Sequence, residues 1–278
     1  MHLHYRHIIA LTLGLCMTMP TLAEDSHDKR KRKGHHTTAG NSVIVEPDRP
    51  ALQARMQYTL EPQADFHVNV SEATRGHGHI NVNHRQGIDV SHYQYTIDWE
   101  RLAQNENISY AYIKATEGNS LLDDYYRQNI EGAHRVGISV GSYHFYRPNV
   151  NWREQFEFMK RIVRIEEQDL VPLIDIEKFG GGSRFVSDLR EFVLAVERHY
   201  GRKPLLYTYQ NFYNKHLRGQ FPDYPWMIAC YSDNQPVLSD GQPYIMWQYS
   251  CKGRLSGIRG DVDRSCLMES YSLRQLKM

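Results

Sequence analysis

The segment Leu170-Val171-Pro172-Leu173-Ile174-Asp175-Ile176-Glu177 decides the fold, because it is typical of a buried strand that ends in two acids. Residues i and i+2 of a strand point to the same face, about 7 Å apart along the backbone. Asp175 and Glu177 are therefore expected side by side in one space. Two like charges so placed favour the protonated form of one of them, which is how a carboxyl group remains a proton donor near neutral pH. This predicts a catalytic pair; a strand end with two solvated acids is the alternative.

Strand-like and helix-like segments alternate on both sides of this strand. We expect strands at residues 87–90, 110–115, 138–145, 170–177, 204–209, 226–231, 244–249 and 261–263. Helices are expected at residues 99–105, 123–136, 151–166 and 185–200, where apolar residues recur at three- and four-residue spacing. This alternation predicts an α/β domain with a mostly parallel sheet, and eight short strands indicate a barrel.

The later connections predict that the barrel is irregular. Only 12 residues separate Tyr231 from Tyr244, and a crossover helix scarcely fits there. We therefore expect antiparallel pairing or bare loops in the last third of the chain. Gly137 and Gly201 stand where helices commonly end.

Four acids are expected at the carboxyl ends of strands, where the chemistry of β/α barrels gathers. They are Asp89, Asp175, Glu177 and Asp263. Aromatic residues accompany them, and such rings stack on sugars while carboxylates do acid–base work. The candidate saccharide contacts are Tyr143, Tyr146, Tyr209, Trp247 and Tyr249. Packing inside the barrel is the alternative for each of these rings.

Seven short motifs, in order and at comparable spacing, give the chain a family resemblance. They are G-I-D-V-S at 87–91, I-D-W at 97–99, I-K-A-T-E-G at 113–118, G-S-Y-H-F-Y at 141–146, L-I-D-I-E at 173–177, W-Q-Y-S at 247–250 and D-V-D at 261–263. The chain resembles glycoside hydrolase family 25, lysozymes that cleave peptidoglycan between N-acetylmuramic acid and N-acetylglucosamine. The resemblance covers most of residues 87–267 and implies a flattened, TIM-like β/α barrel.

The resemblance also implies roles for the acids, with no cofactor. Glu177 matches the general acid and Asp175 its partner, which is expected to assist the substrate's acetamido group. Asp89 and Asp263 match two further active-site aspartates. Asp261 competes with Asp263 for the last position, and the family often has Asn where this chain has Ser265.

Several further readings remain open at the level of sequence. Lys114 and Glu117 are expected to brace the mouth as an ion pair, and His144 is a candidate base that is more often structural. A chitinase-like hydrolase is a rival, although the segment before Asp175 lacks the Gly and Asp of D-G-x-D-x-D-x-E. A non-catalytic glycan-binding barrel is a second rival.

The composition and the N-terminus predict an exported protein that does not bind nucleic acid. Lys and Arg number 33 against 32 Asp and Glu, so no charge bias toward nucleic acid exists. Residues 1–23 resemble a signal peptide, with cleavage before Glu24 and a periplasmic or secreted product. The apolar run 8–19 is too short for a bilayer, and a lipoprotein site at Cys16 is an alternative. We expect a monomer without stable membrane insertion.

Residues 24–86 are expected to form a linker or a small, poorly ordered accessory region before the barrel at 87–278. The region contains the basic cluster 29–33, and its scattered histidines lack the spacing of a metal site, so no metal is expected. Three cysteines remain after signal removal. We expect a disulfide between Cys251 and Cys266, which flank a Gly-containing loop, with Cys230 buried; three free thiols are the alternative.

Overall fold

The computed structural model describes residues 86–180 and 182–278, which include the whole expected barrel apart from Gly181. The expectations for the signal peptide, the basic cluster and the scattered histidines lie outside these residues. None of the helices in the described chain is long and apolar enough to cross a membrane.

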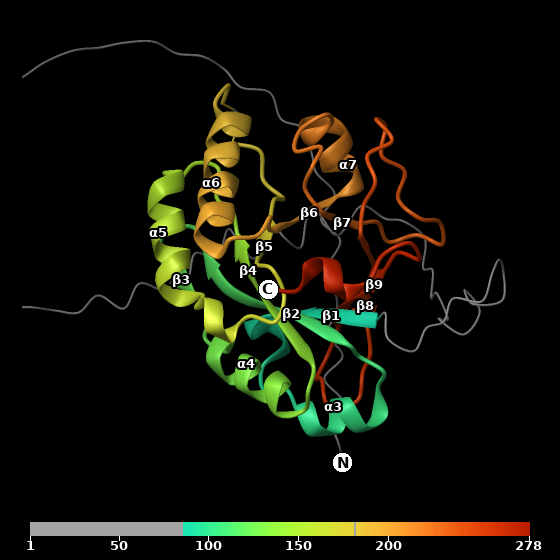
Figure 1. Cartoon of the computed structure of the whole chain (residues 1–278). Coiled ribbons are helices and arrows are strands. Elements are labelled where there is room, and N and C mark those ends of the chain that lie inside the picture. Colours follow the sequence, from blue (N-terminus) through green and yellow to red (C-terminus); the bar gives the residue numbers. More distant parts are fainter. Residues whose placement is uncertain (1–85, 181) are drawn as a thin grey trace, which may run out of the picture. The chain divides into compact units, whose positions relative to one another are not determined.

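Nine strands form one sheet; β3 only extends the edge of β2, and the other eight close into a barrel (Figure 1). The strands are β1 Gln86–Val90, β2 Tyr110–Glu117, β3 Leu121–Leu122, β4 Ser139–Phe145, β5 Leu173–Asp175, β6 Leu205–Tyr209, β7 Trp226–Ala229, β8 Met246–Gly253 and β9 Val262–Leu267. The barrel closes because β1 pairs with both β2 and β9. β9 is antiparallel to both of its neighbours, and the other barrel pairs are parallel. The expected irregular α/β barrel is confirmed.

The helices are unevenly distributed around the barrel. They are α3 Trp99–Asn105, α4 Tyr126–Arg135, α5 Trp152–Ile162, α6 Phe185–Tyr200 and the short α7 Gln210–Phe212, with η2 His92–Gln94, η3 Ile165–Glu167, the π-helical η4 Tyr213–Leu217 and η5 Leu273–Leu276. α4, α5 and α6 cover one flank, whereas β8 and β9 lie on another (Figure 1). No helix occurs in residues 230–245, which are described throughout, so the predicted short late connection is confirmed.

Two helices have the bounds that their sequence pattern predicts, because their ends carry strong local signals. Asp98 accepts a hydrogen bond from the backbone N–H of Arg101 and so caps the first turn of α3. Gly201 ends α6 with φ 70°, a left-handed conformation that glycine adopts at little cost. The expected helix at 151–166 is shorter, because the backbone becomes extended at Val163. Helical conformation returns only in the single turn η3.

The core has two layers, one on each face of the sheet. Outward-facing residues such as Ile113, Ile174 and Leu206 pack with the helices and are fully buried. The inward-facing layer fills the lumen and is rich in tyrosine, including Tyr110 and Tyr112. The alternating side-chain direction of each strand thus separates a helix-packing layer from a lumen layer.

Glycines make room for the lumen tyrosines. A Cβ on Gly87 would lie 2.0 Å from Cε2 of Tyr110, and a Cβ on Gly141 would lie 2.3 Å from Cε1 of Tyr112. Each ring therefore lies over a neighbouring strand at a point where only a hydrogen side chain fits. The amino-terminal end of the lumen is closed by the chain's last residues, since Leu276 is fully buried and its carbonyl accepts the N–H of Val171 at 2.7 Å.

Candidate active site

The four predicted acids converge at the carboxyl end of the lumen. Asp89 on β1 lies directly opposite Asp263 on the antiparallel β9. Asp175 is the last residue of β5, and its register partner on β6 is Tyr207. Glu177 follows two residues beyond that strand end. Strands from opposite halves of the sequence therefore bring their acids to one opening.

Tyr207 interacts electrostatically with three of these acids. Burial raises the pKa of Tyr207 well above its ordinary value, and the charges of Glu177, Asp175 and Asp263 raise it further. Asp89 acts in the same way on the buried Tyr112, whose pKa is raised mainly by burial. The phenols stay protonated at neutral pH, and the hydroxyl of Tyr207 donates a hydrogen bond to Gln248 beside the carboxylates.

Gln248 links Asp89 to two of the tyrosines. Its Nε2 donates to Oδ2 of Asp89 at 3.0 Å, and its Oε1 accepts from the hydroxyls of Tyr207 at 2.9 Å and Tyr231 at 2.8 Å. Gln248 is buried. The two phenols fix which end of the amide is the acceptor, so its NH₂ group must face Asp89, which accepts this bond.

The backbone of the acid pair is held on both sides. The N–H of Tyr146 donates to the carbonyl of Asp175 at 2.9 Å. The N–H of Ile176 donates to Tyr207 at 2.9 Å, and Oγ1 of Thr208 donates to the carbonyl of Ile176 at 2.7 Å. Asp175 is 3% exposed, whereas Glu177 is half-buried. The pair thus presents one enclosed carboxyl and one carboxyl that can reach a bound molecule.

This set of acids at the mouth of a closed, mixed barrel can be compared with known proteins. Residues 88–258, more than half of the chain, match the family model for glycosyl hydrolases family 25. The chain belongs to glycosyl hydrolases family 25. It is therefore a member of a glycoside hydrolase family, and the acids that the match includes are Asp89, Asp175 and Glu177.

Two relatives and one solved structure illustrate the similarity. The chain is 34% identical over 183 residues to YegX of Escherichia coli K12, an uncharacterized protein, with 64% of this chain and 67% of that one covered. It is 32% identical over 196 residues to lysozyme M1 of Streptomyces globisporus, covering 65% and 66%. The crystal structure of a bacterial lysozyme from Streptomyces coelicolor matches with a TM-score of 0.62 and 30% identity, covering 69% of this chain and 95% of that one.

The structure distinguishes the two candidates for the fourth acid of this family-25 site. Asp263 lies within β9 opposite Asp89. Asp261 precedes the strand, is largely exposed, and pairs with Arg254 Nε at 2.9 Å. Asp263 is therefore the residue at the barrel mouth, as the V-D pattern predicts.

Two of the predicted saccharide contacts, Tyr143 and Tyr209, belong to the lumen layer. Tyr143 is 5% exposed and packs with the other lumen rings, so its contact with a glycan stays a prediction. Tyr209 is partly buried where β6 ends, and its ring lies 5.5 Å from that of Phe212. Tyr209 is thus the better placed of the two to meet a ligand.

The ring of Tyr146 belongs to the helix-packing layer, so its contact with a glycan stays a prediction. Tyr146 is 1% exposed, and its ring lies 5.2 Å from that of Phe192 on α6. The residue follows the end of β4, where the chain turns outward into the loop before α5. Its side chain therefore packs the sheet against a helix.

Trp247 and Tyr249 flank Gln248 on β8, and side chains alternate along a strand, so their contact with a glycan stays a prediction. Gln248 points at Asp89, so both neighbours point away from the acids. Trp247 Nε1 donates to the carbonyl of Cys230 at 2.8 Å, and the Tyr249 hydroxyl donates to Oε1 of Gln86 at 2.5 Å. Gln248 and Tyr231 are the site residues that the sequence reading missed.

The prediction of a disulfide between Cys251 and Cys266 is wrong. The described chain has no disulfide among Cys230, Cys251 and Cys266. Cys266 lies opposite Trp247 on β8, whereas Cys251 lies beyond the Ser250–Arg264 pair. The two cysteines are thus offset by two to three residues along β9, roughly 8 Å, while a disulfide needs Cα atoms within about 7 Å.

Three charged residues brace the mouth next to the acids. Nζ of Lys114 donates to Oε2 of Glu117 at 2.6 Å, which confirms the predicted ion pair. Nε of Arg147 donates to the other oxygen of Glu117 at 2.6 Å. Burial alone would raise the pKa of Glu117, but Lys114 and Arg147 outweigh it and lower the pKa. Glu117 is therefore an anion whose two oxygens are both engaged.

His144 is structural, as its motif favours. It is fully buried, with Nδ1 at 2.8 Å from Oγ1 of Thr116 and Nε2 at 3.4 Å from Oε1 of Gln155. Burial lowers the pKa of His144 to about 4, so the ring is neutral at physiological pH. It lies on the helix-packing side of β4, beside Phe192.

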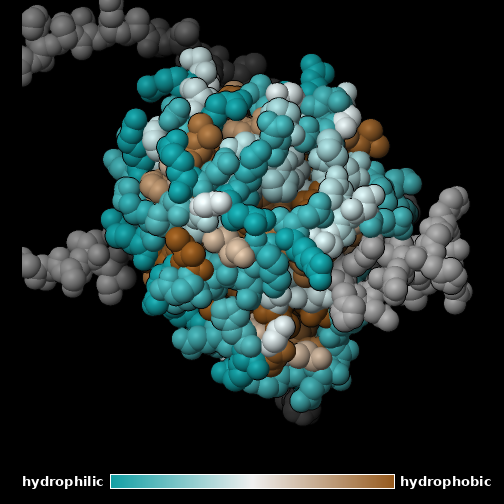
Figure 2. Space-filling view, in the orientation of Figure 1, coloured by the Kyte–Doolittle hydropathy of each residue, from teal (hydrophilic) through white to brown (hydrophobic). Residues whose placement is uncertain are grey.

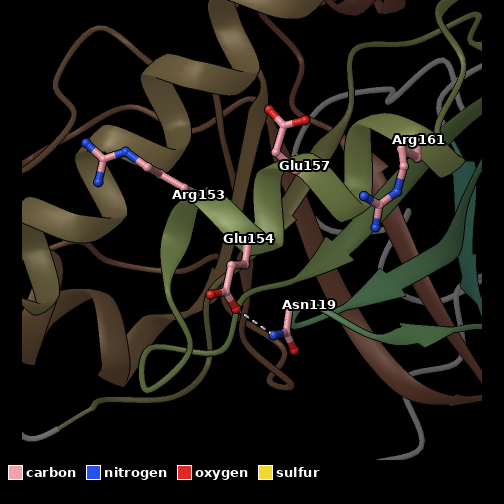
Figure 3. A pocket seen from close by; sticks show the side chains of 5 residues that line it. All are labelled: Asn119, Arg153, Glu154, Glu157 and Arg161. Atoms are coloured by element: carbon pink, nitrogen blue, oxygen red, sulfur yellow. Dashed lines mark hydrogen bonds between the residues drawn. The ribbon is translucent and has the colours of Figure 1, made fainter.

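A separate hollow of about 380 Å³ lies beside α5 (Figure 3). It is lined by Asn119, Arg153, Glu154, Glu157 and Arg161. Asn119 donates to Glu154 Oε2 at 2.8 Å across it. None of the four acids lines this hollow, so it is distinct from the candidate active site. The described residues contain no group of three or more His, Cys, Asp or Glu side chains arranged to hold a metal ion.

Proposed function

We propose that the protein is a lysozyme, hydrolysing the β-1,4 bond between N-acetylmuramic acid and N-acetylglucosamine in peptidoglycan. The single observation that carries this proposal is the convergence of Asp89, Asp175, Glu177 and Asp263 around the hydrogen-bonded pair Tyr207 and Gln248, at the mouth of a family-25 barrel. The similarity to lysozyme M1 supports the same substrate class.

In the proposed mechanism Glu177 protonates the glycosidic oxygen as the bond to the muramic acid anomeric carbon breaks. Glu177 suits this role because it is half-buried and reaches the opening, while the backbone before it is fixed by hydrogen bonds at Asp175 and Ile176. General acids of this kind contribute about 10²- to 10⁴-fold in rate.

Asp175 is proposed to orient the substrate's acetamido group, whose carbonyl oxygen attacks the anomeric carbon. Asp175 and Glu177 come from one strand end and approach the substrate from one side, whereas a direct nucleophile must stand across the bond from the acid, about 5 to 5.5 Å away. Asp89 or Asp263, from the other side of the barrel, is the alternative nucleophile or water base. Inversion of the anomeric configuration would exclude acetamido participation.

The proposal includes the location of the protein. Residues 1–23 are proposed to direct export, so that the mature chain begins at Glu24 and reaches peptidoglycan in the periplasm or outside the cell. It acts there as a monomer without membrane insertion. Amino-terminal sequencing of the protein from the exported fraction tests this part, and an intact residue 1 there would contradict it.

The test of the activity is digestion of purified peptidoglycan by residues 24–278, with mass spectrometry of borohydride-reduced products. Reduced muramic acid ends are expected, and Glu177→Gln should abolish them while leaving the melting temperature unchanged. Glu131→Gln, at an exposed position on α4, is the matched control.

The other outcomes identify the rival functions. Saturable binding to peptidoglycan without new reducing ends would mean a non-catalytic glycan-binding barrel. Cleavage of chitin but not of peptidoglycan would favour a chitinase-like glycosidase. Reduced glucosamine ends would mean that the enzyme cleaves the other glycosidic bond of the strand.

A further inference from the structure

Three cations surround one aromatic ring beside the acid pair. Phe145 is the register partner of Asp175 and is 4% exposed. The Lys114 ammonium lies 5.4 Å from the centre of its ring, the Arg147 guanidinium carbon 5.2 Å and the Lys178 ammonium 5.7 Å. The cations come from β2 and from the chain segments after β4 and β5, so they gather at the carboxyl end of the barrel.

One cation of this cluster has no salt bridge to a carboxylate of the described chain. Glu117 is bonded to Lys114 through one oxygen and to Arg147 through the other. In the described residues Lys178 forms no ion pair, although Glu177 precedes it in the chain and attracts its charge. Among the three cations Lys178 is therefore the one without a salt bridge, although the charges of Glu117 and Glu177 both act on it.

Lys178 is partly removed from water without a salt bridge to any residue that the structure describes. It is half-buried, and burial lowers the pKa of its ammonium, with the Arg147 charge lowering it further. A cation that is partly removed from water without a salt bridge destabilises the free protein, and an anionic ligand would offset that cost. A half-buried cation without a salt bridge next to a catalytic acid is typical of a binding position rather than of a stabilising surface charge.

We propose that Lys178 binds a carboxylate of the glycan substrate, next to the bond that Glu177 cleaves. This inference rests on the proposed function and names the feature that distinguishes the substrate. A muramic acid residue carries a lactyl carboxylate, or a stem peptide with carboxylates of its own, whereas chitin carries neither. Lys178 thus selects muramic acid over N-acetylglucosamine on one side of the site, while Lys114 and Arg147 keep Glu117 from competing for it.

The test measures binding in the Glu177→Gln background, so that turnover does not interfere. Calorimetry compares three glycan tetrasaccharides: one stripped of peptide with its lactyl carboxylates free, the same one with the carboxylates reduced to alcohols, and one bearing stem peptides. We expect the carboxylate-bearing forms to bind about 10-fold more tightly than the reduced form. Adding Lys178→Met should remove that difference, and Lys178→Arg should retain most of it.

The outcomes separate the inference from the proposed function. A loss with the stripped glycan identifies the lactyl carboxylate as the ligand, and a loss confined to the peptide-bearing glycan identifies the stem peptide; either result supports the proposal. Equal weakening for all three glycans, or no weakening, overturns it. Lys252→Met, on the exposed side of β8, is the control for net charge. Turnover by the chain with Glu177 intact tests the lysozyme activity separately.

Discussion

The two ends of the barrel lumen use the same strands for different purposes. On β5 the inward residue Leu173 is followed, two positions later, by Asp175, and on β8 Met246 is followed by Gln248. On β9 the inward residues run from Leu267 at the floor to Asp263 at the mouth. The floor is thus apolar and closed by the C-terminal segment, whereas the mouth collects carboxylates and their hydrogen-bond partners.

The inward-facing side chains of a single strand therefore serve two purposes. Those at the floor stabilise the barrel, and those at the mouth form the candidate active site. The face drawn in Figure 2 is mostly hydrophilic, with smaller hydrophobic areas between, so most of the apolar packing that holds the barrel is internal. Substitutions at the floor or in the helix-packing layer should therefore change the free energy of unfolding. Substitutions at the mouth should change turnover.

The largest effect is expected at the mouth, from Asp175→Asn. The amide keeps the shape of the side chain but removes the charge proposed to stabilise the acetamido group, so kcat should fall by about 10²-fold or more. Steady-state rates on soluble peptidoglycan fragments, with a thermal melt, provide the measurement. Asp124→Asn, at an exposed position before α4, is the control. A rate within twofold of the unaltered enzyme would remove Asp175 from the mechanism.

A comparable effect on stability is expected from His144 in the helix-packing layer. Burial lowers its pKa to about 4 from an ordinary value of 6.5. Because the unfolded chain binds the proton first, this stabilisation is complete above pH 6.5 and is lost as the pH falls toward 4, by about 3 kcal/mol.

The measurement for His144 is the free energy of unfolding at pH 7 and at pH 4.5, for the wild type and for His144→Gln. The wild type should lose more stability between the two pH values than the variant does. Equal losses in the two proteins would show that His144 is not the group responsible for this part of the acid sensitivity.

A smaller loss of stability is expected at the lumen from Gly141→Ala. The new Cβ would lie 2.3 Å from Tyr112, and overpacking of this kind costs about 1 to 3 kcal/mol. Denaturant unfolding should show the loss, while activity per folded molecule changes little. Gly182→Ala is the control, since its Cβ would meet nothing within 4 Å. Unchanged stability in Gly141→Ala would mean that the lumen rings shift freely.

The smallest effect is expected on the outer face of β8, from Trp247→Phe. The change removes the hydrogen bond to the Cys230 carbonyl, which contributes about 1 kcal/mol, and leaves Gln248 and the acids in place. Activity should stay within twofold. A tenfold loss of kcat/KM without a matching loss of stability would place Trp247 on the substrate and contradict the strand's alternation.

Much of the barrel follows from local sequence signals. The alternation of strands and helices, the stop at Gly201 and the short connection after β7 are all readable from neighbouring residues. Asp89 and Asp175 are readable as well, because they stand near the carboxyl ends of parallel strands. Asp263, expected at the end of a strand at 261–263, instead stands near the start of β9, and the antiparallel direction of β9 brings it to the same mouth. β3 and the π-helical η4 were not predicted, since a two-residue strand and a five-residue π-helix have too little periodic pattern to be recognised.

The direction of individual side chains was less predictable than the positions of the strands. Trp247, Gln248 and Tyr249 alternate whichever way the strand is turned, so the sequence does not tell which of them face the lumen, and in the structure Gln248 does. Which residues of β8 face the lumen depends on its pairing with β7 and β9. Irregular loops connect β8 to both strands, so this pairing is not readable from neighbouring residues. The same long-range register decides between Asp261 and Asp263, and it separates Cys251 from Cys266.

β1 is the earliest strand of the described chain, yet it completes its pairing only with the last one, β9. Gln248, which fixes Asp89, lies 159 residues after it. Contacts so distant in sequence form late, because the loop between them must first be ordered. A nascent chain that lacks β8 and β9 has an open barrel and only part of its acid set. During synthesis the site can therefore assemble only when nearly the whole domain has been made. A C-terminally truncated product that lacks β8 and β9 has no complete site.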